Sequence, residues 1–162
     1  TGTWNLIDGR TYCINLLSVA GTATPGGGEI NLAVGTCPAN MMGANGFAKI
    51  SNVWIFGTSA DGTLKNCRVK FGGLLILNGS STAGNTILPE ERTIYNTGST
   101  GTQIISGVSN VLTSYTVLNN AAILRGAINT GTDTSVIVSA ISPAGTTAAS
   151  LMSSKLFITY IP

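Results

Sequence analysis

Apolar and polar residues alternate along much of this chain, as they do in a β-strand with one buried face. The clearest example is the segment from Leu64 to Phe71. Its apolar side chains fall on one face of an extended strand and its polar side chains on the other: Cys67, Val69 and Phe71 against Asn66, Arg68 and Lys70. The paired glycines at positions 72 and 73 then predict a bend before the apolar run Leu74 to Leu77.

Other segments rich in β-branched and aromatic residues predict further strands. They cover residues 11–19, 29–34, 47–56, 92–96, 102–106, 111–118, 122–128, 135–141 and 155–161. Turn residues separate them, including Gly26 to Gly28, interpreted as a hairpin tip, and the SADG sequence of Ser59 to Gly62. Polar loops are expected at 78–85 and 142–147, and short helices only at 39–42 and 148–153.

This arrangement predicts an all-β protein with little helix. About 8–10 short strands in a chain of 162 residues fit an antiparallel β-sandwich of jelly-roll type. We expect a single domain over residues 1–162, with residues 1–10 as a candidate N-terminal arm or connection to an assembly. The run from Val136 to Ile141 is apolar on both faces, so we expect a neighbouring subunit to cover its outer face.

The composition narrows the class of partner. Only 9% of the residues are charged, and the net charge is +2. Lys65, Arg68 and Lys70 form one local basic group, interpreted as a solvated strand face, because the interleaved aromatics of a nucleic-acid site are missing. No apolar run approaches the roughly 20 residues that span a bilayer. Nucleic-acid binding and membrane insertion are therefore not expected.

Metal, cofactor and disulfide sites are not expected either. The chain has no histidine and only three cysteines, with no CxxC spacing, which is too few ligands for zinc. We interpret Cys13, Cys37 and Cys67 as free thiols in strands, and a Cys13–Cys37 bond stays open as the alternative. The triple glycine at 26–28 lacks the GK[ST] ending of a phosphate loop.

Catalytic chemistry also finds little support. Without histidine the Ser-His-Asp arrangement cannot form, and the adjacent Glu90 and Glu91 would point to opposite sides of a strand. A carboxylate pair assembled from distant loops or across subunits stays open, with Asp61 as one possible member. The chain is therefore expected not to be an enzyme, and no catalytic residue is assigned.

Sugar binding is the small-ligand function that the aromatic residues allow. Four of them are candidates: Trp4, Trp54, Tyr95 and Tyr115. Trp54 lies inside an apolar strand and is interpreted as a core residue, so no binding residue is assigned. The sequon Asn78-Gly79-Ser80 is interpreted as a chance match.

Three segments carry a resemblance to jelly-roll C-terminal and head domains of tailed-bacteriophage structural proteins. GTLKNCRVKFGGLLIL, residues 62–77, resembles their strand–Gly-Gly–strand signature. ERTIYNTGSTGTQIISG, residues 91–107, resembles the strand, Asn-Thr-Gly loop and strand that follow. KLFITYIP, residues 155–162, resembles the closing strands of trimeric fibre heads. The resemblance covers about the last 100 residues, and no repetitive fibre shaft precedes Thr11.

This resemblance implies a virion protein on a tail fibre, head fibre or capsid surface. It would act in assembly and in attachment to the host, as a homotrimer in contact with other virion proteins and with a host-surface glycan. The alternative is a pilus or filament subunit that assembles when residues 1–7 insert as a strand into the next subunit. A carbohydrate-active enzyme is disfavoured because acid–base residues are missing.

Overall fold

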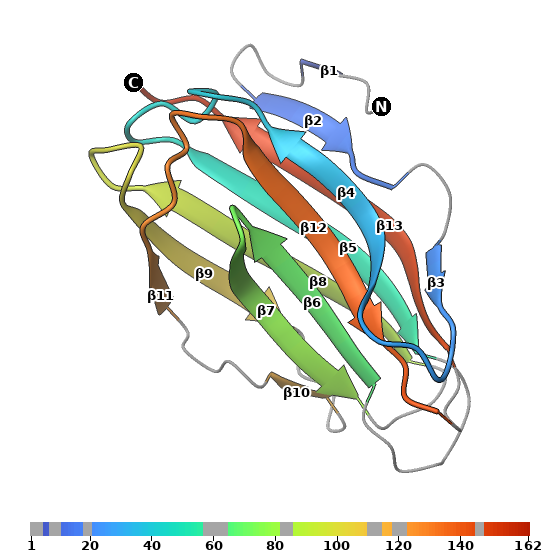
Figure 1. The fold of residues 1–162 in the computed structure, drawn as a ribbon. Coiled ribbons are helices and arrows are strands. Elements are labelled where there is room, and N and C mark those ends of the chain that lie inside the picture. The colour runs from blue at the N-terminus through green and yellow to red at the C-terminus, as the bar shows by residue number, and fades with distance from the viewer. Residues whose placement is uncertain are drawn as a thin grey trace.

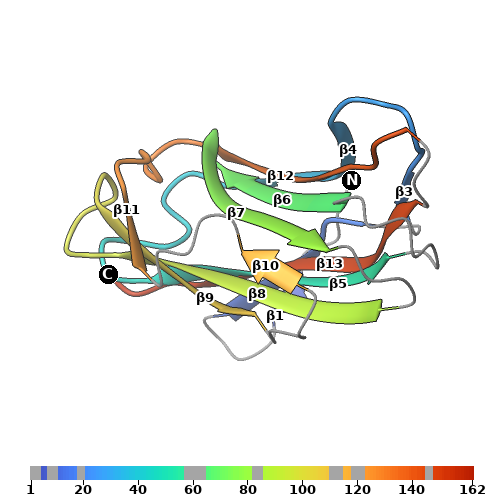
Figure 2. The ribbon, with the colours of Figure 1, turned by 90° about the horizontal axis from the view of Figure 1, so that it is seen from below.

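The computed structural model describes residues 5–6, 11–17, 21–56, 65–81, 86–109, 115–117, 123–144 and 148–162. These residues form strands, turns and bends, and none of them lies in a helix. The strands make two antiparallel sheets that lie face to face (Figures 1 and 2). The expected all-β sandwich is confirmed.

The larger sheet, sheet A, has eight strands. In spatial order they are β1 (Asn5–Leu6), β2 (Thr11–Asn15), β13 (Ala149–Thr159), β5 (Phe47–Phe56), β8 (Thr86–Asn96), β9 (Gln103–Ser109) and β11 (Ile123–Gly126), and β3 (Gly21–Ala23) pairs with β13. Sheet B has five, in the order β10 (Tyr115–Val117), β7 (Leu74–Ser81), β6 (Lys65–Phe71), β12 (Thr134–Ile141) and β4 (Ile30–Cys37).

The order of pairing is that of a jelly roll. Strands from opposite ends of the chain lie side by side: β2 pairs with β13, and β4 pairs with β12. The next strands nest inside them, because β5 pairs with β13 and β6 pairs with β12. The eight principal strands thus form the two four-stranded sets β2-β13-β5-β8 and β4-β12-β6-β7, as expected of a double Greek key.

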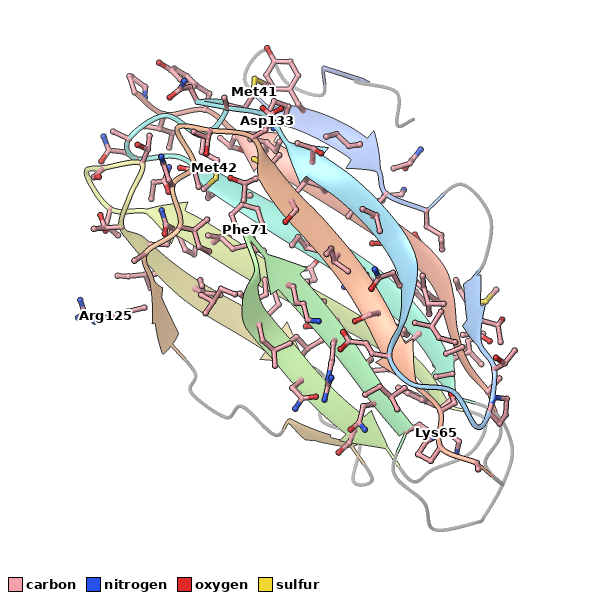
Figure 3. The ribbon with its side chains drawn as sticks, in the orientation of Figure 1. Met41, Met42, Lys65, Phe71, Arg125 and Asp133 are labelled. Carbon is pink, nitrogen blue, oxygen red and sulfur yellow. The ribbon has the colours of Figure 1, made fainter. Side chains whose placement is uncertain are left out.

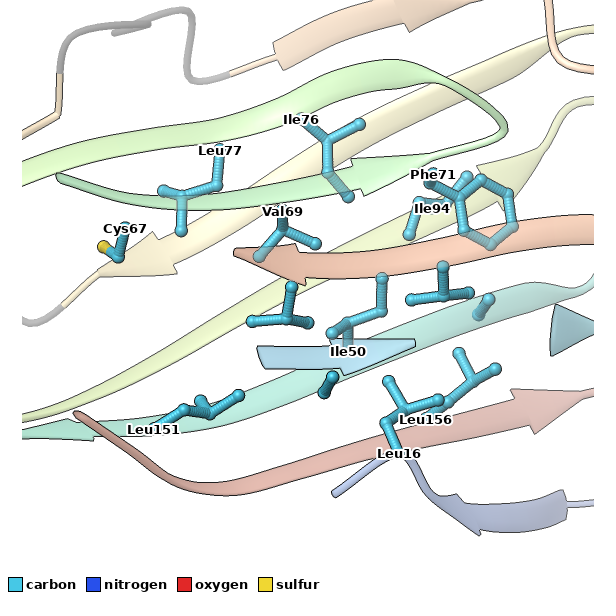
Figure 4. Close-up of a cluster of buried hydrophobic side chains, with 14 of the residues drawn as sticks. Leu16, Ile50, Cys67, Val69, Phe71, Ile76, Leu77, Ile94, Leu151 and Leu156 are labelled. Atoms are coloured by element: carbon cyan, nitrogen blue, oxygen red, sulfur yellow. The ribbon is translucent and has the colours of Figure 1, made fainter. Parts of the chain in front are cut away.

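Alternation along each strand builds the core between the sheets. In β5 the side chains of Ala48, Ile50, Trp54 and Phe56 are fully buried, and each is separated from the next buried position by a half-buried residue. Sheet B supplies Cys67, Val69 and Phe71 from β6, the face that the sequence predicts (Figure 4). At roughly 25 cal/mol per Å² of apolar surface, this burial is the main stabilisation of the fold.

Several segments differ from the sequence-based expectation. Residues 148–153 are not a helix, because β13 already begins at Ala149 and pairs with β5. Residues 39–42 form turns, β8 begins at Thr86 rather than at residue 92, and β7 continues to Ser81 into the expected loop. Thirteen strands are described rather than 8–10, because short strands of two to four residues (β1, β3, β10 and β11) join the sheet edges. The SADG turn lies outside the described residues.

Candidate functional site

At one end of the sandwich, a buried network of hydrogen bonds joins several loops and turns. Gln103, the first residue of β9, uses its amide group to bridge several chain segments. Its Oε1 accepts a hydrogen bond from the backbone N–H of Ile128 at 2.7 Å, and its Nε2 lies 2.8 Å from the Ile128 carbonyl. The same Nε2 lies 3.0 Å from the Thr100 carbonyl and 3.0 Å from Asn96 Oδ1. Gln103 therefore fixes the residues just after β11 against the β8–β9 turn.

Asn96 and Thr130 extend this network to the turns after β4. Asn96 Nδ2 donates to the carbonyl of Gly43 at 2.6 Å and to Thr130 Oγ1 at 2.8 Å. The backbone of Thr130 donates to the Thr100 carbonyl and accepts from the N–H of Asn40. Because buried amides that are fully paired rigidify their surroundings, the loop of residues 127–133 is held in one conformation.

A hollow of about 370 Å³ opens beside this loop. It lies where the loop enters β12 and faces the turn between β6 and β7. Its lining consists of Gly72, Ala127, Ile128, Asn129, Thr132, Asp133, Thr134 and Ser135. Figure 3 shows Asp133 at the same end of the molecule as Met41 and Met42, with Lys65 at the opposite end. No sequence pattern marks this hollow, because its residues come together only in the folded chain.

Among the described residues of this lining, Asp133 is the only charged one. Its Oδ1 accepts a hydrogen bond from the backbone N–H of Ala39 at 2.9 Å, which fixes the carboxylate against the turn after β4. Burial, with the negative charge of Asp133 as a second cause, raises the pKa of the Cys37 thiol to about 12. Cys37 therefore stays a neutral thiol and is a weak nucleophile.

A second polar group crosses the outer face of sheet B. Glu29, just before β4, accepts hydrogen bonds from Lys70 Nζ at 2.7 Å, Ser139 Oγ at 2.6 Å and Arg68 Nη1 at 2.9 Å. Burial acts to raise the pKa of Glu29, but these three donors outweigh it and lower the pKa to about 2. Arg68 also donates to Asn78 Oδ1 at 3.2 Å. Arg68 and Lys70 are therefore paired with Glu29 rather than presented together as a free basic patch.

Lys65 does not belong to the solvated face that the sequence predicts. It is fully buried, in phase with Cys67 and Val69 on the inner face of β6. The two-residue period that places Cys67 and Val69 inward also places Lys65 inward. Its charge is the reason why the sequence predicts it on the surface.

A third polar group lies inside the sandwich, on the inner face of sheet A. Glu90 Oε1 lies 3.1 Å from Arg92 Nε, and Glu90 Oε2 accepts from Asn52 Nδ2 at 3.3 Å. Asn52 Oδ1 in turn accepts from Ser154 Oγ at 2.7 Å. Burial raises the pKa of Glu90 to about 7, because it outweighs the opposing effects of Arg92 and of the Asn52 hydrogen bond.

Glu90 and Glu91 point to opposite faces, as the sequence predicts. Glu90 is buried, whereas the Glu91 side chain is 45% exposed and lies 3.4 Å from Lys49 Nζ on the outer face. They cannot act as a catalytic carboxylate pair facing one cleft. Asp61 lies outside the described residues.

The aromatic candidates are dispersed. Trp54 is a core residue, as expected, and Tyr95 is 40% exposed on the outer face of sheet A beside Phe47. Trp4 lies outside the described residues, and only the strand position of Tyr115 is described. Neither of the two candidates whose side chains are described, Trp54 and Tyr95, lines the hollow.

The cysteines carry no disulfide. Cys13, Cys37 and Cys67 are all free thiols, so the interpretation preferred from the sequence is confirmed. Across the described ranges, histidine, cysteine and acidic side chains nowhere gather into a group of three that could hold a metal. The same part of the chain contains no helix long and apolar enough to cross a membrane.

Comparisons with known proteins give distant likenesses only. No protein-family model and no curated protein matches the sequence. The fold is similar to the CBM2 module of the evolved Dit of Lactobacillus casei phage J-1, at 10% identity and a TM-score of 0.45, over 100% of this chain and 81% of that chain. It is also similar to peanut lectin, at 10% identity and a TM-score of 0.40, over 98% and 90% of the two chains.

Part of the infectious bursal disease virus Gx strain is similar at 13% identity and a TM-score of 0.34, over 93% of this chain and 40% of that chain. Because these TM-scores are below 0.5, they carry no argument about function. The assignment of the chain to the jelly-roll class of β-sandwiches therefore rests on its own strand pairing.

Proposed function

We propose that this chain is a virion-surface or fibre jelly-roll module that acts in assembly and in attachment to a host surface. The jelly-roll topology and the resemblance of residues 62–77, 91–107 and 155–162 to phage head domains support this proposal. The observation that carries it is an apolar patch on the outer face of sheet A. The proposed partners are further copies of the chain in a homotrimer, other virion proteins and a host-surface glycan.

The sheet A patch consists of Val53, Ile55, Ile87 and Pro89. Val53 lies opposite Pro89, and Ile55 lies opposite Ile87, on the neighbouring strands β5 and β8. The residues between them in sequence point into the core, so these four side chains point outward. Ile87 is 62% exposed.

Polar residues follow the patch along the same strands. The next outward row contains Ser51, with Lys155 and Glu91 as its cross-strand partners on either side. An apolar centre beside a polar margin is typical of protein–protein interfaces. The patch therefore suits contact with a second copy, which would also remove exposed apolar surface from water.

The test is the molar mass of the purified chain in solution, measured by light scattering. We expect a discrete trimer, and we expect Ile87→Lys to shift it toward the monomer because a charge would be buried at the contact. Val34→Lys is the matched control. Val34 is similarly exposed, at 59%, but lies on β4 in the other sheet, so this variant should stay trimeric.

Other outcomes would overturn the proposal. A wild-type chain that stays monomeric at all concentrations would refute assembly through the patch. Long polymers that disappear when residues 1–8 are deleted would favour the filament subunit.

We also propose that the chain has no enzymatic activity of its own. Glu90 is the described carboxyl with a pKa suited to acid–base chemistry near neutral pH, but it is buried in the core, where no substrate can reach it. Release of reducing sugar from host polysaccharide that Glu90→Gln or Asp61→Asn abolishes would contradict this proposal.

A further inference from the structure

The hollow beside residues 127–135 has the size and chemistry of a small-ligand site. Its volume of about 370 Å³ falls within the range of roughly 300–1,000 Å³ that is common for such sites. Its described lining combines one carboxylate with amide and hydroxyl groups, and none of these described side chains is basic. An anionic ligand would therefore meet the charge of Asp133 without a compensating cation.

Several polar groups of the lining remain able to bind a ligand. Asn129 Oδ1 accepts a hydrogen bond from the N–H of Gly131 at 3.0 Å, so the Nδ2 group of Asn129 remains as a donor. Asp133 uses Oδ1 for Ala39, which leaves Oδ2 as an acceptor. Together with the exposed hydroxyl of Ser135, these groups offer donors and acceptors side by side. Such a mixture matches the hydroxyl groups of a sugar, which both donate and accept.

The hollow is also preformed. Hydrogen bonds of Gln103 and Thr130 hold the loop of residues 127–133 in place. Within the loop, Thr134 Oγ1 lies 3.1 Å from the Thr132 carbonyl and 3.4 Å from the Asn129 carbonyl. A site whose groups are already held in place loses less conformational entropy when a ligand binds.

Gly72 forms the opposite wall. Its φ of +56° is in the left-handed region, and a Cβ at this position would overlap the side chain of Ile128. The turn can therefore approach the loop closely only with glycine at this position. Ile128 is only 8% exposed, so the groups that a ligand can reach in this hollow are mainly polar.

We propose that this hollow binds a neutral saccharide unit, with Asp133 accepting hydrogen bonds from sugar hydroxyls and Asn129 donating to a ring substituent. The inference rests on the proposed function in attachment, because it supplies the host-contacting site. The hollow and the sheet A patch lie on different elements, so binding and assembly can be tested separately.

The test is an NMR titration of the purified full chain with a panel of neutral monosaccharides: glucose, galactose, mannose, rhamnose and N-acetylglucosamine. We expect at least one sugar to shift the backbone amides of Gly72, Asn129, Gly131 and Ser135. Asp133→Asn keeps an oxygen that can accept from Ala39, so it should preserve the fold and weaken binding about tenfold. A spectrum that otherwise overlays the wild type confirms that the fold is intact.

Ser135→Arg is a second variant, which should block the hollow and abolish the shifts. Thr36→Arg is its matched control, because Thr36 lies directly opposite Ser135 on β4, is exposed, and does not line the hollow. This control should bind like the wild type. If no sugar shifts these amides, or if Ser135→Arg responds like the wild type, the saccharide site is refuted. Light scattering on the same samples reports separately whether the proposed assembly has failed.

Discussion

Glu90 allows the sharpest prediction, because its carboxyl is buried inside the sandwich next to a cation. Burial raises the pKa of Glu90 from 4.5 to about 7 even though Arg92 Nε lies 3.1 Å away. Between these two pH values the folded chain keeps a proton that the unfolded chain has lost. The folded state is therefore favoured less and less as the pH rises through this window. At about 1.4 kcal/mol per pH unit, the loss amounts to about 3 kcal/mol.

The substitution Glu90→Gln removes this titration and keeps the shape of the side chain. Near pH 4 both proteins carry a neutral group beside Arg92, so their free energies of unfolding should be similar. By about pH 8 the variant should be more stable than the wild type by about 3 kcal/mol. Urea unfolding at a series of pH values measures the difference, and titrations shared by both proteins, including that of Glu29, cancel in it.

Glu91→Gln is the matched control for this experiment. It removes the neighbouring carboxylate, which is on the outer face and pairs with the half-exposed Lys49, so its effect should stay within about 1 kcal/mol at every pH. The opposite trend for Glu90→Gln would refute the reasoning. If the wild type gains stability over that variant as the pH rises, Glu90 is ionised in the fold and the attraction of Arg92 outweighs burial.

Three further predictions test the other polar groups. Glu29→Gln should remove about 1–2 kcal/mol of stability near neutral pH and almost none near pH 2, because the lowered pKa of Glu29 stabilises the fold above pH 4.5 and is lost as the pH falls toward 2; urea unfolding at the two pH values checks this. Gln103→Leu leaves the buried N–H and C=O of Ile128 unpaired and should cost about 3 kcal/mol in the same assay. Gly107→Ala places a methyl group on the guanidinium of Arg92, so it should weaken the ion pair and raise the pKa of Glu90 further, as measured by carboxyl NMR titration.

The sequence predicts best those strands that are rich in apolar residues and bounded by turn residues. The bounds of β5 match the expected 47–56, because this apolar-rich run lies between two glycines. β13 was missed at its start because Ala149, Leu151 and Met152 favour helix locally, while the final structure is decided by pairing with β5. The sequence does not predict the start of β8, because Pro89 is unusual inside a strand. It is tolerated there because the described pairing with β9 begins only at Glu90, so the missing N–H costs no ladder hydrogen bond on that side.

The polar sites were much less predictable than the strands. Lys65 and Glu90 are charged residues at inward-facing positions. A charged residue is expected at the surface when only the sequence is known, because charged side chains are rarely buried. The hollow joins Gly72 of the β6–β7 turn to residues more than fifty positions later. What brings them together is the pairing of β6 with β12, a contact between segments distant in sequence. Alternation specifies each strand but not which strand lies next to it.

The few charges of this chain are mostly committed to internal partners, and this has a consequence for assembly. Among the described acidic residues, Glu29 pairs with Arg68 and Lys70, Glu90 with Arg92, and Glu91 with Lys49. Little charge repulsion then opposes the approach of two copies, and the contact proposed for the sheet A patch is apolar. Screening by salt should therefore not weaken association, and sulfate should strengthen it because excluded salts favour apolar burial. A trimer that dissociates as sodium chloride is raised would instead show that charged groups, rather than Ile55 and Ile87, hold the copies together.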